Sequence, residues 1–296
     1  KITQLTLGLE SFESGDFIVT AAEIFDGLGK IPAMTVELEV INAGAMAKLE
    51  NVRGLSANLT VTAEMQTSGS AKPERVYSGT VQRAEVQWGT PTRLRLHLSA
   101  WPRQNVSYTK GYRFFQDKTA IEIVTSIYEA VDHSRVSVAP AARPYQVQYG
   151  ESDADFVSRI LLREQLLFRI ATVADKGSKW SSKLHVYSQL SNLPESEPEL
   201  SYVTTTNTQD VVDTSIVDLT VTVPFAPDAV GAAAYSTKSP TVDLRVPSSG
   251  LGGWVELHTH GRYGRQNDGT DWINHQLKAQ RAARYHFTWN ALHASV

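Results

Sequence analysis

A strand pattern that runs directly into a capped helix, over residues 145–164, constrains the fold more than any other part of this sequence. Aromatic or apolar residues alternate with glutamines from Tyr145 to Tyr149, which is the period of a half-buried strand. Ser152 stands three positions before Asp155, a spacing at which the serine hydroxyl can accept a hydrogen bond from a free amide of the first turn. The Asp155 carboxylate is stabilised there by the positive end of the helix dipole. We therefore expect a helix that begins at about Asp153.

The expected helix has one apolar face. Its stripe follows helical spacing and consists of Phe156, Val157, Ile160 and Leu161. Asp155, Arg159 and Arg163 lie off this stripe, four residues apart, where opposite charges can pair. These patterns predict a strand, a turn and a helix docked by its apolar face.

The first hundred residues indicate antiparallel β structure. Apolar and polar residues alternate in three stretches, 35–40, 58–63 and 93–98. Glycine, serine or proline breaks separate such stretches at residues 27–29, 68–70 and 89–91. This arrangement fits a small barrel or a sandwich over residues 1–101.

Residues 102–200 have a mixed character. Thr119 and Glu122 form a capping-box pattern, followed by apolar residues at helical spacing: Ala120, Ile123, Val124, Ile127 and Val131. The helix after Ser152 comes next, and two strands, 167–173 and 184–187, flank a turn at Asp175–Ser178. Residues 192–198 form a polar loop with two prolines, which we take as a boundary.

Alternation resumes after residue 201. We expect strands at 216–223 and 242–246, a helix opening at Asp271 with Trp272, Ile273 and Leu277 inside, and a strand starting at 287–289. The predicted class is therefore α+β and mainly antiparallel β, with domains at 1–101, 102–200 and 201–296.

Composition excludes several classes of protein. The 296 residues, 42% of them hydrophobic and 20% charged, suffice for two or three compact units. Cysteine is absent, which excludes disulfides and cysteine-bound zinc. A net charge of −3 argues against nucleic acid as the main partner. Residues 1–70 carry nine acids and four bases, whereas 71–118 carry nine bases and three acids, a pattern that fits either subunit docking or solvated strand faces.

Three groups of residues could carry chemistry, and each also has a structural interpretation. His258 and His260, with His275, could hold a transition metal, but exposed histidines beside a glycine-rich loop are the interpretation we favour. Glu151, Asp153 and Asp155 could form an acid/base pair, but a helix start explains them. Aromatic residues near the end could stack sugars, although core or subunit packing is favoured: Trp254, Tyr263, Trp272, Tyr285 and Trp289. We predict no catalytic, cofactor or metal site.

Two segments also resemble a known family. The sequence of residues 145–159 resembles a signature of the VgrG spike proteins of type VI secretion and of the late-control (gpD-type) tail hub proteins of contractile phages. Upstream, 115–119 with 121–124 resembles the Phe-Gln-Asp-Lys-Ser/Thr helix start of that family, and 76–81 resembles its aromatic-x-Gly-x-Val strand. One position departs: the family usually has Glu-Gly after the helix, and here Gln165 follows Glu164.

The resemblance implies a role in a contractile injection machine. In such hubs two similar β-barrel tube domains are joined by a mixed α/β part, and three subunits present six barrels to the tube. It implies a homotrimer that joins an Hcp-like tube protein to a downstream spike module. It also implies synthesis in the bacterial cytoplasm, assembly at the tip of the tube and exposure outside the cell on firing. We expect the second barrel to be incomplete and the spike to lie downstream or to be absent.

Two other functions remain open on the residues alone. A cell-wall hydrolase would use the histidine or carboxylate groups, and a carbohydrate-binding β module would use the aromatic residues. Turnover, sugar binding and a trimeric ring in electron microscopy discriminate between the three hypotheses.

Overall fold

The chain folds into two compact units, residues 1–198 with 293–296, and residues 199–292. A computed structural model describes residues 2–63, 74–101, 110–137, 140–175, 179–188, 190–194, 201–202, 215–223, 229–235, 240–249, 255–261, 266–282 and 286–291. Among these residues, no helix combines the length and the apolar character needed to cross a bilayer.

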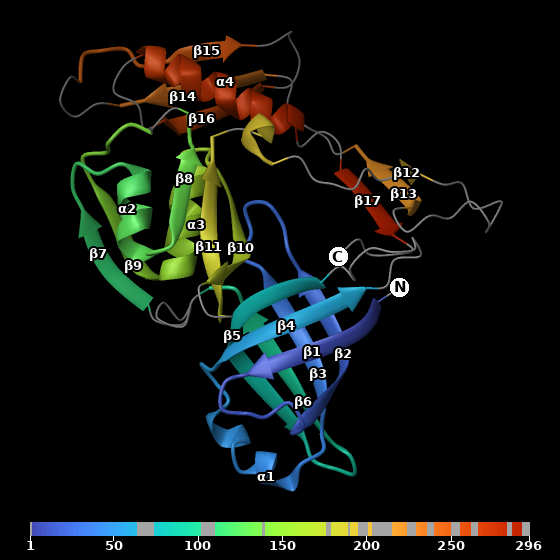
Figure 1. Ribbon diagram of the computed structural model, residues 1–296. Helices are drawn as coiled ribbons and strands as arrows, with labels where there is room; N and C mark the ends of the chain where they lie inside the picture. Colours follow the sequence, from blue (N-terminus) through green and yellow to red (C-terminus); the bar gives the residue numbers. More distant parts are fainter. Residues whose placement is uncertain are drawn as a thin grey trace. The chain divides into compact units, whose positions relative to one another are not determined.

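A six-stranded antiparallel sheet opens the first unit (Figure 1). Its strands are β1 (Ile2–Leu9), β2 (Phe17–Phe25), β3 (Ala33–Val40), β4 (Ser56–Ala63), β5 (Glu74–Gln87) and β6 (Thr92–Ser99). Their order is β1-β4-β5-β6-β3-β2, and the edge strands β1 and β2 approach each other. The sheet is therefore a nearly closed barrel, with the short helix α1 (Ala43–Met46) and a 3-10 turn (Leu49–Asn51) between β3 and β4.

The alternation in the sequence determines which side chains fill this barrel. Val36, Leu38 and Leu96 point inside and are almost fully buried, as the pattern predicts. On the outer face, Arg95 Nε donates to Glu37 Oε1 over 3.0 Å. Part of the charge asymmetry between residues 1–70 and 71–118 is thus neutralised within the barrel itself.

The second part of this unit mixes strands and helices. Its elements are β7 (Lys110–Phe115), α2 (Ala120–Ile127), β8 (Val131–Arg135), β9 (Gln146–Ser152), α3 (Asp153–Arg163), β10 (Leu167–Asp175), β11 (Lys179–Tyr187) and a 3-10 turn (Leu190–Asn192). β10 and β11 form the predicted hairpin, β8 joins β11 in parallel, and β7 pairs with β9. One apolar cluster unites both helices with β10 and β11.

Helix α2 begins as predicted and ends earlier. The hydroxyl of Thr119 accepts from the amide of Glu122, and the Glu122 carboxylate accepts from the amide of Thr119, which confirms the capping box. The assignment of Val131 to this helix was wrong, because Val131 starts β8. At the helix end the backbone of Tyr128 is extended, and its buried hydroxyl donates to the carbonyl of Ser182 over 3.0 Å.

Helix α3 ends in a left-handed residue that is not glycine. Gln165 has a φ of 58°. Its amide donates to the carbonyl of Leu162, and the amide of Leu166 donates to the carbonyl of Leu161, a Schellman arrangement. A side chain at such a φ is strained, since Cβ approaches the backbone oxygen.

Gln165→Gly should therefore stabilise the protein. The expected gain in the free energy of unfolding is about 0.5 to 1 kcal/mol, because relief of strain exceeds the extra entropy of glycine in the unfolded chain. Chemical denaturation measures it. As a control, Gln165→Ala keeps the strained φ and should show no gain; equal stabilisation by alanine would contradict the strain argument.

The barrel and the α/β part are joined by direct contacts within this unit. Gly29, at a φ of 72°, donates its amide to the carbonyl of Phe168 over 2.7 Å. The Asp26 carboxylate accepts from Arg169 at 3.1 Å and lies 3.5 Å from Arg75. Ala100 and Trp101, just after β6, belong to the apolar cluster of the α/β part. We refer to these contacts as the joint.

The described residues of the second unit form two three-stranded sheets. Their strands are β12 (Ser201–Tyr202), β13 (Ser215–Thr222) and β17 (His286–Ala291), and β14 (Ala229–Ala234), β15 (Val246–Ser249) and β16 (Val255–Gly261). Helix α4 (Gln266–Ala282) packs on the second sheet through Ile273 and Leu277. The predicted strands at 216–223 and 287–289 are confirmed.

Two boundaries in this unit were wrong. α4 starts at Gln266 rather than at Asp271. The strand predicted at 242–246 begins only at Val246. Asp243 explains the second difference, because its carboxylate accepts from the amide and the guanidinium of Arg245 and so holds a local turn.

The fold class predicted from the sequence is confirmed: the chain is α+β, and its described residues form mostly antiparallel strands, few helices and one nearly closed barrel. A second barrel over 201–296 and the division at 101 and 200 stay predictions.

Candidate functional site

Residues 145–159, which we call the signature segment, form the start of α3 in the way their sequence predicts. Ser152 is the N-cap, and its hydroxyl accepts from the amide of Asp155 at 3.1 Å and donates to the Asp155 carboxylate at 2.6 Å. The apolar stripe is fully buried: Phe156, Val157, Ile160 and Leu161. Phe156 stacks on Phe115 of β7, with ring centroids 5.7 Å apart.

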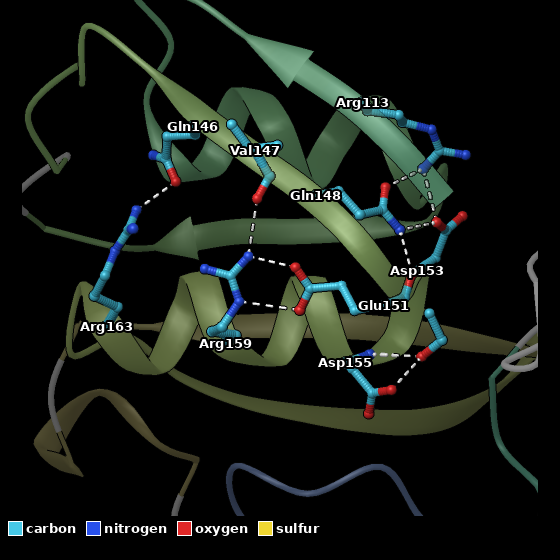
Figure 2. Close-up of polar contacts among 10 residues, drawn as sticks. Arg113, Gln146, Val147, Gln148, Glu151, Asp153, Asp155, Arg159 and Arg163 are labelled. Atoms are coloured by element: carbon cyan, nitrogen blue, oxygen red, sulfur yellow. Dashed lines mark hydrogen bonds and ion pairs between the residues drawn. The ribbon is translucent and has the colours of Figure 1, made fainter. Parts of the chain in front are cut away.

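A partly buried polar group connects β7, β9 and the first turn of α3 (Figure 2). Arg113 Nη1 donates to Asp153 Oδ1 over 2.8 Å, and Gln148 Nε2 donates to the same oxygen over 2.8 Å. Gln148 is fully buried and also donates to the carbonyl of Glu151 over 3.0 Å. Asp153 therefore holds two strands to the helix, which is more than a dipole contact.

Gly111 on β7 provides the space for this amide. A Cβ at position 111 would lie 2.7 to 2.9 Å from the amide atoms of Gln148. Since real contacts are longer, any side chain at 111 would displace Gln148 from Asp153.

The arginines of α3 reach back to β9 rather than along the helix. Arg159 pairs with both carboxylate oxygens of Glu151 and donates to the carbonyl of Val147 over 3.0 Å. The hydrogen bonds to Glu151 raise the pKa of the Arg159 guanidinium. Arg163 donates to Gln146 Oε1. The predicted pairing of Asp155 with Arg159 was wrong, because Asp155 is occupied by the cap at Ser152.

A further ion pair fixes the helix end. Arg143, before β9, pairs through two nitrogens with the carboxylate of Glu164, the C-cap of α3. The Glu164 side chain is only 10% exposed, so a fork-shaped partner is needed to offset its desolvation.

These contacts leave the carboxylates of the segment with structural tasks. Figure 2 shows Glu151 engaged by Arg159, and Asp153 engaged by Arg113 and Gln148. Asp155 is engaged by Ser152. The arrangement fastens a two-stranded sheet to a helix.

Arg113 and Gln148 were not predicted as members of this group. One signal was present in the sequence: Gln146 and Gln148 alternate with Tyr145, Val147 and Tyr149, so one face of this strand had to be polar. That this face meets a helix, and not water, depends on the tertiary structure.

Asp153→Asn should destabilise the protein by about 1 to 2 kcal/mol, because the Arg113 guanidinium loses its charged partner. The sequence alone predicts at most about 1 kcal/mol, the size of a helix-end charge effect. Urea denaturation at neutral pH measures the difference. Asp155→Asn, which changes an exposed cap residue, is the matched control and should cost less than Asp153→Asn.

The histidine prediction is not tested by the structure. His258 and His260 lie in β16 and His275 lies in α4, but their side chains are outside the described residues. Elsewhere, the side chains that the structure does describe contain no group of three potential metal ligands.

We therefore keep the metal prediction as an expected result. Elemental analysis after dialysis should find far less than one transition metal per chain, since two histidines on one strand do not complete a tetrahedral site. A full equivalent that disappears in the double variant His258→Ala, His260→Ala would contradict this expectation.

The aromatic candidates near the end of the chain fall into two groups. Trp272 is half-buried and packs against the apolar cluster of α4, as core packing predicts. Trp254, Tyr263 and Tyr285 are outside the described residues, and Trp289 lies in β17, with a side chain outside them.

Comparison with known proteins gives one family. The sequence model described as phage tail baseplate hub (GPD) matches residues 32–293. A search of curated proteins gives no significant match.

Solved structures share the fold at low identity. A tail protein from Neisseria meningitidis has a TM-score of 0.60 and 12% identity, over 96% of this chain and 79% of its own. An Escherichia coli type VI secretion component, described as similar to phage tail proteins, has a TM-score of 0.52 and 19% identity, over 74% of this chain and 56% of its own. A chain of the Francisella PdpA-VgrG complex has a TM-score of 0.51 and 9% identity, over 86% and 43%. The chain thus corresponds to about half the length of the last two.

Proposed function

The chain belongs to the phage tail baseplate hub family, and from this premise we propose that it is a structural, non-enzymatic hub of a contractile injection machine. In this proposal it is a homotrimer that connects the sixfold end of an Hcp-like tail tube to a threefold, membrane-puncturing spike. The subunit is made in the bacterial cytoplasm, assembles at the tip of the tube and is exposed outside the cell on firing.

The observation that carries the proposal is the structural role of the carboxylates in the signature segment. Its conspicuous carboxylates, Glu151, Asp153 and Asp155, are engaged in holding β7 and β9 to α3. A hub has to transmit compression, and charge-assisted hydrogen bonds between a strand pair and a helix resist relative sliding. This use supports a mechanical role better than a hydrolytic one.

A second support is the joint between the barrel and the α/β part. Asp26 is shared by Arg75 and Arg169, and Gly29 is bonded to Phe168. A subunit that carries load from a tube towards a spike requires such direct connections between its parts.

The proposal is tested with the chain and an Hcp-like tube protein. Mixed particles imaged by electron microscopy should show a ring of three copies of the chain at the tube end. A folded preparation that forms no ring with any tube protein of its own system, and that cleaves peptidoglycan or binds its glycan strands, would contradict the hub and favour the enzyme or the carbohydrate-binding module.

A further inference from the structure

The sheet of β7 and β9 has two faces of opposite character. Its inner face carries Arg113, Phe115 and Gln148 towards α3. Its outer face is aromatic and solvent-exposed: Tyr112 is 66% exposed, Phe114 68%, Tyr145 55% and Tyr149 78%. We call these four residues the aromatic face.

The four rings are ordered by one another. Tyr112 and Tyr149 are opposite each other in the strand pairing and pack edge to face, with centroids 5.4 Å apart. Phe114 and Tyr145 stack at 6.0 Å. A hypothetical Cβ on Gly150, at a φ of 63°, would lie 3.4 Å from the Tyr112 hydroxyl oxygen, so that ring covers the bare backbone. Side chains arranged in this way lose little entropy when a partner covers them.

The size of the aromatic face suits an interface. At 55 to 78% exposure, four aromatic side chains present about 400 to 650 Å². Soluble monomers rarely expose more contiguous apolar surface than this, and each partner in a typical complex buries about 800 Å². The face therefore supplies the apolar centre of a contact and needs only a polar rim.

Its chemistry points to protein as the occupant. The four side chains are tyrosines and a phenylalanine and offer no cationic group, so the face does not suit phosphate or an anionic membrane surface. Tyrosine and phenylalanine are the residues enriched in the centres of protein interfaces. Charged residues of the barrel, such as Glu37 and Arg95, already pair within the subunit and leave less for electrostatic docking.

We propose that the aromatic face binds a second copy of this chain, as the contact between neighbouring subunits of the ring. The proposal rests on the proposed function and deepens it, because it names the contact surface. In a closed trimer each copy uses two different surfaces, so the aromatic face meets a different surface of its neighbour and not its own counterpart.

The absence of cysteine from the chain makes a direct test possible. Tyr149→Cys introduces a single thiol within the face, and Tyr235→Cys introduces one at an exposed position of the second unit, where Tyr235 is 72% exposed. Sedimentation of the full chain up to about 1 mM gives the oligomeric state, and maleimide labelling gives the protection of each thiol. In the trimer, the thiol from Tyr149→Cys should react at least about tenfold more slowly than in dilute monomer, because a contact that covers the face excludes water and reagent from it. The control thiol should not change.

Because Tyr149→Cys removes one of the four rings, the substitution could itself weaken the contact. A second variant therefore tests the contact without a cysteine. Phe114→Ser should weaken association by about tenfold or more and should leave the circular dichroism spectrum unchanged. Salt between about 0.05 and 0.5 M should have little effect on this contact, in contrast to one made by charges.

Each outcome decides between the two proposals. A trimer with an unprotected thiol at 149 overturns the aromatic contact and leaves the hub intact. A disulfide-linked dimer through that thiol also overturns it, because the face then pairs with itself. If the chain stays monomeric at about 1 mM, both the contact and a self-assembling trimer are rejected.

Discussion

Phe156→Ala should lower the free energy of unfolding by about 3 to 5 kcal/mol, because a fully buried ring is removed and a cavity is left between β7 and α3. Phe156 is 0% exposed and stacks on Phe115, so no solvent-facing space is available into which the site could relax. Urea denaturation followed by circular dichroism measures the loss.

Leu162 provides a control on the same helix. It is 51% exposed and lies six residues after Phe156, and Leu162→Ala should change stability by less than about 1 kcal/mol. If the two substitutions had equal effects, the assignment of α3 as a helix docked by one face would be wrong.

Gly79→Val should cost about 3 kcal/mol or more, because the barrel has no room for a side chain at this position. A Cβ on Gly79 would lie 2.9 Å from the carbonyl oxygen of Ser99 and 2.8 Å from the methyl group of Met34. Met34 is buried and could adjust, but the carbonyl belongs to β6 and is fixed by its strand pairing. Thermal unfolding measures the shift.

Gly15 is the matched glycine for this experiment. It lies in the turn before β2, and a Cβ there would meet nothing within 4 Å. Gly15→Ala should therefore be neutral or should stabilise the protein by up to about 1 kcal/mol, because alanine lowers the conformational entropy of the unfolded chain. Destabilisation of both variants to the same extent would show that glycine content, and not the close approach at Gly79, limits stability.

The parts of the fold that the sequence predicted are those with strong local signals. The cap at Ser152, the capping box at Thr119 and the alternation in β3, β4 and β6 depend on neighbouring residues, and all are confirmed. The helix start at 271 was placed five residues late, because Gln266 carries no capping signal and packing decides where α4 begins.

The polar contacts of the candidate site were less accessible to prediction. Arg113 meets Asp153 across 40 positions, and Arg143 meets Glu164 across 21. Spacing along a helix suggested that Arg159 would pair with Asp155, but Glu151, on the strand before the helix, offered both oxygens. Which of two acidic residues an arginine selects depends on how β9 turns into α3, and no local pattern contains this information.

The joint has a consequence for any attempt to excise the barrel. Asp26 and Arg169 are 143 positions apart, so their contact can form only after β10 has been synthesised. Trp101, 1% exposed, follows the last barrel strand but is buried against α2 and α3. A fragment cut at residue 101 would keep all six strands and yet expose this indole to solvent, at a cost of about 2 kcal/mol. The exposed ring would also add an apolar patch that favours aggregation. During synthesis the same surface stays exposed until α2 and α3, which end at Ile127 and Arg163, have followed.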